Sequence, residues 1–478
     1  MPSNQHFCLK TFGFIFAPIL FILMLALPSP QGLEPAGWRV AAVGLLMATL
    51  WVTESIPIPM TSLLPLLFFP LLHVGSVQDA AAPYANPLIF LFMGGFIIAI
   101  AIQRWNLHRR IALTIIALIG MHPRSIIAGF MVATAVLSMW VSNTAATLLM
   151  LPIAMSVIDL TAKKDNHQDK FSIVLLLGLA FSSSIGGLGT LIGTPPNALL
   201  AGFMQENYDI QIGFAQWMMV GIPIILIGLP LNYVILTFVI FPLGQIQHNG
   251  SVDFIRTELS KMGRLTHAEL RVAIIFIIVA LLWMVRPLIS QIIPTLNDAG
   301  IAILGAFLMF IVPSGTQKGK FLLDWKSAEK LPWGILLLFG GGLSLAWAIS
   351  ESNLSTWIGS QLSVLQVAPL WLLILVVVLV IITLTGFTSN TATAAAFLPI
   401  MGSVAISIGI DPVRLAAPTA IAASCAFILP VATPPNAIVY SSGKISMLDM
   451  LKAGLVLNLI FAMVITLFSV FFMPIVFG

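Results

Sequence analysis

The sequence contains very little charge, which excludes most classes of soluble protein. Only 8% of its residues are charged, whereas 59% are hydrophobic and the mean hydropathy is +1.06. Soluble domains carry about 25% charged residues, so we expect this chain to reside in a lipid bilayer. Its net charge of +4 is spread over short loops and forms no basic stripe. We therefore expect no nucleic-acid partner.

Cysteines and catalytic motifs are also scarce. We interpret Cys8 and Cys425, the only two cysteines, as unpaired packing residues in apolar surroundings. The sequence has no His-Glu-x-x-His and no Gly-x-Ser-x-Gly motif, so we predict that the protein is not an enzyme. The apolar stretch after Lys10 lacks a small-residue cleavage site, and we interpret it as an uncleaved first span.

The apolar runs predict an all-α, multi-pass membrane protein, because about 20 apolar residues span the hydrocarbon core. If the N-terminus is cytoplasmic, 18 of the 21 Lys and Arg residues lie on the cytoplasmic side of the membrane. Only Arg39, Arg286 and Arg414 then lie on the opposite side. This asymmetry predicts a protein of the cell (inner or plasma) membrane in that orientation. The eleven expected spans are 11–27, 37–54, 58–74, 87–103, 171–204, 214–240, 271–290, 297–313, 332–350, 414–443 and 453–477.

Two polar motifs interrupt the apolar runs, and each occurs twice. Ser142-Asn143-Thr144 and Ser389-Asn390-Thr391 are 247 positions apart. The same separation relates Gly94-Gly95 to Gly341-Gly342, two glycine pairs that we expect to be close-packing positions. Thr-Pro-Pro-Asn begins at Thr194 and again at Thr433, 239 positions later. The chain is therefore an internal duplication.

The two Ser-Asn-Thr blocks predict a pair of opposed re-entrant hairpins. Basic residues flank 125–158 on both sides, so its two ends lie on one face, and its 34 residues are too few for two crossings. Block 368–408 lies between loops poor in Lys and Arg, so it enters from the other face and the repeats are inverted. The expected organisation is a first span in 1–36, repeats 37–242 and 271–478, and a cytoplasmic linker 243–270. Each repeat holds a hairpin and a proline-broken helix, 171–204 or 414–443.

The motif blocks indicate an ion-binding site built from neutral groups. No Asp, Glu, Lys or Arg occurs in 125–158, 171–204, 368–410 or 415–443. Helix N-termini at Thr144 and Thr391 favour an anion, whereas unwound carbonyls near Gly193 and Ala432 favour a small hard cation. A dianion bound together with cations would need no buried arginine.

These motifs resemble the divalent-anion:sodium symporter family over nearly the whole chain. The resemblance rests on both motif pairs and on two further stretches: Trp51-Val52-Thr53-Glu54-Ser55-Ile56-Pro57-Ile58-Pro59 and Ser424-x-x-Phe427-x-x-Pro430-Val431-Ala432-x-x-x-Asn436-x-Ile438-Val439. It implies a homodimer that works by an elevator-type mechanism and takes up C4 dicarboxylates such as succinate, malate or fumarate with sodium. Sodium is then a transported ion, and a small divalent anion and the lipid bilayer are its other partners.

The resemblance also implies roles for individual residues. One sodium site would use Ser138, Ser142, Asn143 and Gly193, and the other Thr385, Thr388, Asn390 and Ala432. The substrate would be bound by Ser142, Asn143, Thr144, Ser389, Asn390, Thr391, Thr194, Pro195, Thr433 and Pro434.

Other transport functions fit the same residues. Neutral hydroxyls and amides suit sulfate or citrate as well as a C4 dicarboxylate. Proton coupling and sodium-independent exchange use the same kind of scaffold. A channel is disfavoured, because the duplication is antiparallel and internal and indicates no ring of subunits.

Overall fold

A computed structural model describes residues 3–120, 122–161, 166–243, 251–290, 292–315, 319–361 and 369–477. In these ranges the only strand-like pairing is an isolated bridge between Pro313 and Phe321. Nine helices of the described ranges are long and apolar enough to cross a bilayer, and several shorter apolar helices accompany them. The predicted all-α membrane fold is confirmed. Residue 368 and residues 244–250 of the predicted linker lie outside the described residues.

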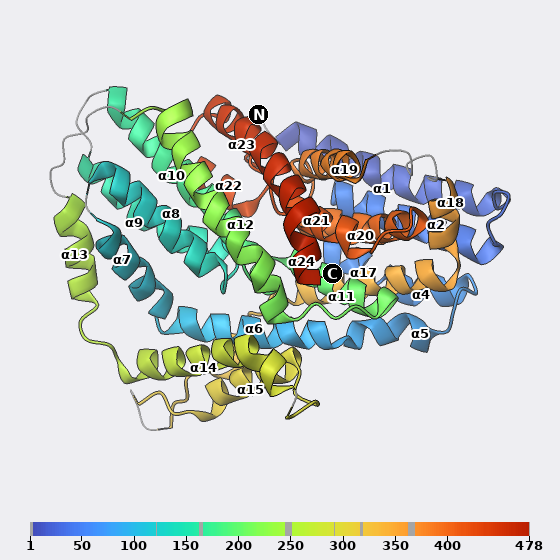
Figure 1. Cartoon of the computed structure of the whole chain (residues 1–478), viewed down its shortest axis with the longest axis horizontal. Helices are drawn as coiled ribbons and strands as arrows, with labels where there is room; N and C mark the ends of the chain where they lie inside the picture. The colour runs from blue at the N-terminus through green and yellow to red at the C-terminus, as the bar shows by residue number, and fades with distance from the viewer. Residues whose placement is uncertain are drawn as a thin grey trace.

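The first half of the chain consists of a series of helices that runs through the first Thr-Pro-Pro-Asn segment. One further long helix follows that segment (Figure 1). Its helices are α1 (Ser3–Ala26), α2 (Pro35–Thr53), α3 (Ile58–Thr61), α4 (Leu64–Leu71), α5 (Val77–Ala81), η1 (Ala82–Ala85), α6 (Pro87–Arg104), α7 (Leu107–Ile119), α8 (Pro123–Ser138), α9 (Asn143–Thr161), α10 (Asn166–Gly187), α11 (Pro195–Tyr208), α12 (Phe214–Val234) and η2 (Ile235–Ile240). The predicted span 58–74 corresponds to an apolar helical stretch that is interrupted, because Pro65 lacks the N–H that a continuous helix needs and two short helices form there.

The second half repeats this order. Its helices are α13 (Ser251–Lys261), α14 (His267–Ile289), α15 (Asp298–Ile311), α16 (Trp325–Ala328), α17 (Trp333–Glu351), α18 (Leu354–Gln361), α19 (Leu370–Thr385), α20 (Asn390–Ser407), α21 (Val413–Ala423), α22 (Pro434–Tyr440), α23 (Met447–Leu467), η4 (Phe468–Phe472) and α24 (Met473–Phe477).

Close glycine contacts hold the helices that surround the motif segments. Helix α6 packs along α15, and these two helices and α14 occupy one edge of the molecule in Figure 1. A Cβ atom at Gly94 would lie 2.6 Å from the carbonyl carbon of Ala302. A Cβ atom at Gly341 would lie 2.2 Å from the carbonyl oxygen of Ser62. Both glycines are therefore close-packing positions, as expected from the repeat.

The motif segments of the two repeats interlock. Helix pairs α8–α9 and α19–α20 lie at the predicted hairpins, and α10–α11 and α21–α22 lie at the predicted breaks. Helix α22 packs against α9 and α10, while α11 packs against α20 and α21. The second helix of each break thus contacts one hairpin helix and one broken-segment helix of the other repeat, and this exchange brings all four motif segments together.

A buried ion pair joins α7 to the start of α14. Arg110 donates from Nε and Nη2 to the Glu269 carboxylate, at 3.1 and 3.2 Å, and Glu269 is 3% exposed. Glu269 also completes a capping box with Thr266, because its carboxylate accepts from the Thr266 N–H at 2.8 Å.

We expect Arg110→Ala to destabilise the protein by about 3 kcal/mol, because it leaves a buried carboxylate without its cation. Thermal unfolding of the detergent-solubilised protein measures this effect. Lys261→Ala is the control, since it removes an exposed partner of Glu258 and should change stability by about 0.5 kcal/mol or less. Equal melting temperatures for the two variants would contradict the prediction.

Candidate functional site

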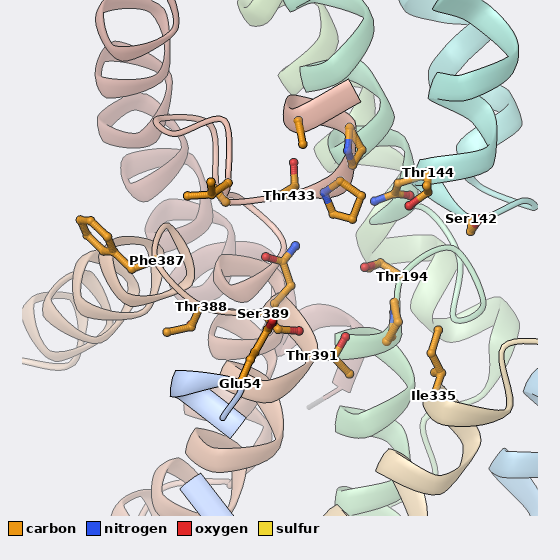
Figure 2. A pocket seen from close by; sticks show the side chains of 18 of the residues that line it. Glu54, Ser142, Thr144, Thr194, Ile335, Phe387, Thr388, Ser389, Thr391 and Thr433 are labelled. Carbon is orange, nitrogen blue, oxygen red and sulfur yellow. The ribbon is translucent and has the colours of Figure 1, made fainter. Parts of the chain in front are cut away.

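The four motif segments line one cavity of about 480 Å³. Segments 142–144 and 193–195 come from the first repeat, and 387–391 and 431–435 from the second. Figure 2 shows Thr144, Thr194, Thr391 and Thr433 around this space, each from a different segment. The cavity therefore contains every residue predicted to bind substrate.

Helix N-termini face this cavity from several directions. Helix α9 begins at Asn143, α20 at Asn390 and α11 at Pro195, and the short α22 begins at Pro434. Unpaired N–H groups and the helix dipole make each N-terminus favourable for an anion by about 0.3–1 kcal/mol. The cavity is suited to negative charge although its motif segments contain no Lys or Arg.

Asn143 and Asn390 are held in the same way in the two repeats. The Ser138 hydroxyl donates to Asn143 Oδ1 at 2.5 Å, and the Thr385 hydroxyl donates to Asn390 Oδ1 at 2.8 Å. Both donors are fully buried and lie five residues before their asparagine. Ser183 adds a bond of 2.9 Å from its hydroxyl to the Asn143 carbonyl. These bonds fix the two amides at the ends of the cavity-lining helices.

The backbone is non-helical where cation-binding carbonyls were predicted. Residues 188–194 and 424–433 contain no helix, and they include Gly193 and Ala432. A Cβ atom at Gly193 would lie 2.4 Å from the carbonyl oxygen of Gly187. A Cβ atom at Gly187 would lie 2.7 Å from Asn143 Oδ1. Asn143, Gly187 and Gly193 are consequently packed together, as one set of oxygen ligands requires.

The Thr-Pro-Pro segments close the cavity on both sides. Thr194 and Thr433 are 2% and 4% exposed, and each precedes a helix that starts with two prolines. The Thr433 hydroxyl accepts the N–H of Asn436 at 3.3 Å and caps α22. The Thr194 hydroxyl lies 3.4 Å from that of Ser424, so the two breaks are in direct contact.

Two of the predicted site hydroxyls, those of Ser142 and Thr388, make hydrogen bonds within the protein, and a third predicted residue, Ser389, lines the cavity. The Ser142 hydroxyl accepts the N–H of Ala145 at 3.3 Å. The Thr388 hydroxyl donates to the Leu384 carbonyl at 3.0 Å and lies 2.6 Å from the Thr393 hydroxyl. Ser389 lines the cavity beside Asn390. The hydrogen bond to the Asn390 amide comes from Thr385, and a cation role for Thr388 stays a prediction.

Two charged residues of the cavity were missed in the sequence. Lys10 on α1 and Glu54 at the end of α2 both line it, and Figure 2 shows Glu54 below Ser389. Glu54 ends α2 in a left-handed backbone conformation (φ 47°), and its position there brings it to the cavity beside the second hairpin. The acidic residue within the Trp51–Pro57 motif was the available signal.

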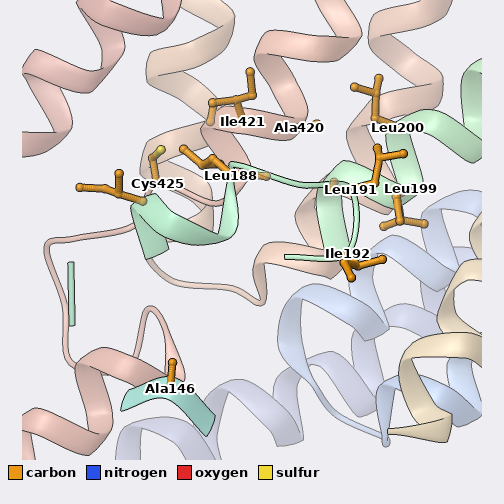
Figure 3. Packing of buried hydrophobic residues seen from close by; sticks show 14 of the residues in the cluster. Ala146, Leu188, Leu191, Ile192, Leu199, Leu200, Ala420, Ile421 and Cys425 are labelled. Atoms are coloured by element: carbon orange, nitrogen blue, oxygen red, sulfur yellow. The ribbon is translucent and has the colours of Figure 1, made fainter. Parts of the chain in front are cut away.

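An apolar layer supports the broken segments from behind. Leu188 and Leu191 of the first break belong to the same buried cluster as Ile421 and Cys425 of the second repeat (Figure 3). Cys425 is fully buried and free, as predicted, whereas the side chain of Cys8 lies outside the described residues. This packing holds the non-helical segments of the two repeats against each other.

Comparisons with known proteins agree with this geometry. Residues 10–478 match the family described as the sodium:sulfate symporter transmembrane region. The sodium-dependent dicarboxylate transporter SdcS of Staphylococcus aureus strain USA300 is 46% identical over 477 residues, which cover 98% of this chain and 92% of the relative.

Two solved structures share the fold at low sequence identity. The YdaH transporter of Alcanivorax borkumensis has a TM-score of 0.58 at 14% identity, with 98% of each chain covered. MtrF of Neisseria gonorrhoeae has a TM-score of 0.61 at 15% identity, with 97% of this chain and 94% of that chain covered. The family match extends over almost the entire sequence and includes all four motif segments. This chain therefore belongs to the sodium:sulfate symporter family, a family of membrane transporters rather than enzymes.

Proposed function

We propose that this protein imports C4 dicarboxylates such as succinate, malate or fumarate together with sodium ions. One observation carries the proposal: four motif segments from two repeats meet at one cavity, and no motif residue there is charged. Helix N-termini supply the partial positive charge for the anion, and broken segments supply oxygens for the cations. The 46% identical relative, whose name specifies sodium-dependent dicarboxylate transport, supports the same substrate class.

A dicarboxylate suits the cavity better than sulfate does. Each repeat contributes its own Ser-Asn-Thr helix start, so the donors for negative charge come in two separate sets. An anion with two separated carboxylates can contact both sets, whereas the compact sulfate ion would contact one. The cavity volume of about 480 Å³ also lies within the usual range for small-molecule sites, about 300–1,000 Å³.

We propose an elevator-type movement for the transport step, with 37–242 and 271–478 as inverted repeats. The helices that interlock at the cavity, α8–α11 and α19–α22, would move together against the remaining helices. The bias of Lys and Arg favours a cytoplasmic N-terminus in the cell membrane. Because Lys10 follows that N-terminus and lines the cavity, the conformation described would open to the cytoplasm. A homodimer is expected from the family resemblance.

Uptake into proteoliposomes tests the proposed function. We expect labelled succinate to accumulate with an inward sodium gradient, to be competed by malate and fumarate, and not to accumulate when potassium replaces sodium. Uptake of sulfate without uptake of succinate would show that sulfate, and not a dicarboxylate, is the substrate of this protein. Uptake that needs internal dicarboxylate and no sodium would indicate an exchanger, and it would contradict the coupling.

Thr144→Ala and Thr391→Ala should each raise the KM for succinate about 10-fold or more. Each change removes a hydroxyl at the cavity, and a hydrogen bond to a charged group contributes about 1.5–3 kcal/mol. The concentration of sodium that gives half-maximal uptake should change far less. Thr383→Ala is the matched control, because its hydroxyl donates to the Leu379 carbonyl on an exposed face of α19. A larger effect at Thr383 than at either cavity threonine would contradict this assignment.

A further inference from the structure

Asn197 and Asn436, which end the two Thr-Pro-Pro-Asn segments, make the same hydrogen bonds in both repeats. Asn197 Nδ2 donates to the carbonyls of Gly187 and Thr190, at 3.0 and 2.8 Å. Asn436 Nδ2 donates to the carbonyls of Ala426 and Leu429, at 3.1 and 3.0 Å. In both repeats the acceptors lie ten and seven residues before the asparagine. Each amide therefore ties the broken segment to the helix that follows it.

In each repeat, the carbonyl that lies seven residues before the asparagine also accepts a second hydrogen bond. The donor of this second bond is the backbone N–H of a predicted cation ligand. The Thr190 carbonyl also accepts the N–H of Gly193 at 3.3 Å. The Leu429 carbonyl also accepts the N–H of Ala432 at 3.2 Å. One carbonyl thus joins the asparagine amide to the N–H of the residue whose carbonyl was predicted to bind sodium. A change at the asparagine can therefore reach that residue through a single shared oxygen atom.

Neither asparagine is placed to bind the substrate. Both side chains are fully buried, and neither residue is among those that line the cavity. Their Oδ1 atoms have no hydrogen-bond partner within the described part of the chain, so the donor side of each amide is the side in use. The hydrogen bonds of both side chains therefore go to backbone carbonyls of the broken segments, and through them these residues can affect transport.

We propose that Asn197 and Asn436 are positioning residues for the two sodium ions, one in each repeat. This inference rests on the proposed sodium-coupled function and adds residues that the motif comparison did not assign to the site. Small hard cations need several oxygens at defined distances, and non-helical carbonyls keep such positions only when other groups hold them. The amide supplies this support for Gly193 and Ala432, and its loss should weaken sodium binding more than substrate binding.

Kinetics in proteoliposomes separate the two kinds of binding. For Asn197→Ala and Asn436→Ala, we expect the sodium concentration for half-maximal uptake to rise about 10-fold. The KM for succinate at saturating sodium should change by less than about threefold. Asn232→Ala is the matched control, because Asn232 is equally buried but donates at 3.3 Å to the Ser182 hydroxyl on α10 and makes no hydrogen bond to residues 188–194 or 424–433. Its sodium dependence should equal that of the wild type.

A binding measurement avoids dependence on transport. Sodium should raise the melting temperature of the solubilised wild type, and the sodium concentration needed for half of this rise should increase about 10-fold in both variants. If an alanine variant does not fold, Asn197→Ser and Asn436→Ser retain a shorter donor and are tested in the same way. Folded variants with wild-type sodium dependence, or with the KM for succinate shifted more than the sodium requirement, overturn the inference. Sodium-independent uptake by the wild type would instead overturn the proposed function.

Discussion

Asn143→Ala and Asn390→Ala should each lower sodium-driven succinate uptake at least about 100-fold, a loss equivalent to about 2.7 kcal/mol. Each amide lines the cavity at a helix start and accepts a hydrogen bond from a fully buried hydroxyl, Ser138 or Thr385. Each substitution removes an amide that was predicted to contact both the sodium ion and the anion. It also leaves the buried hydroxyl without its amide partner.

Initial uptake rates at saturating sodium and succinate measure this loss, together with gel filtration to confirm folding. Asn207→Ala is the control, because its amide bonds the Phe203 carbonyl at the far end of α11. Asn143→Asp provides a sharper test, since it keeps the size of the side chain but adds a negative charge beside the substrate. We expect it to abolish succinate uptake and to retain stabilisation by sodium. Wild-type uptake by Asn143→Ala and Asn390→Ala would rule out the proposed site.

Gly193→Ala should reduce uptake to less than about 5% of wild type. Its Cβ would lie 2.4 Å from the Gly187 carbonyl oxygen, a distance that requires the backbone of 188–194 to move. This segment carries one of the predicted sodium-binding carbonyls. The second repeat already has alanine at the equivalent position, Ala432, so the requirement for glycine is specific to the first break.

Sodium-dependent uptake and thermal stabilisation by sodium are the two measurements for Gly193→Ala. Gly342→Ala is the matched control, because the nearest atoms to a Cβ there lie 3.6 Å away, an ordinary contact distance. Ala432→Gly should retain most activity, since it removes one methyl group and introduces no clash. Full sodium dependence in Gly193→Ala would show that the first break tolerates displacement, and it would argue against a cation at this position.

The local features of the site could be predicted from sequence because their causes are local. Prolines start α11 and α22, and the Ser-Asn-Thr motifs start α9 and α20, since these residues dictate where helices begin. The capping box at Thr266 was predictable for the same reason. The pattern of two polar interruptions in each repeat was sufficient to find all four cavity segments.

The remaining features depend on tertiary structure. Nothing near Lys10 or Glu54 in the sequence indicates that α1 and α2 reach the second hairpin. The packing of α11 against α20, and of α22 against α9, joins residues more than 180 positions apart. Pro65 divides a span whose hydropathy alone predicts one helix. Asn197 was visible within its motif, but its two acceptors in the preceding turn were not predictable from residue type.

The neutral lining of the cavity determines how membrane voltage would act on the transport cycle. Lys10 and Glu54, its only charged lining residues in the described part of the chain, lie on α1 and α2, outside the segments proposed to move. The cavity walls proposed to move then carry no charged side chain, so within the cavity voltage acts on the bound ions. Each net charge moved through 100 mV contributes about 2.3 kcal/mol. A dianion transported with two sodium ions would therefore produce no current. A third sodium ion would make every cycle electrogenic. The current per transported dianion would thus give the number of sodium ions directly.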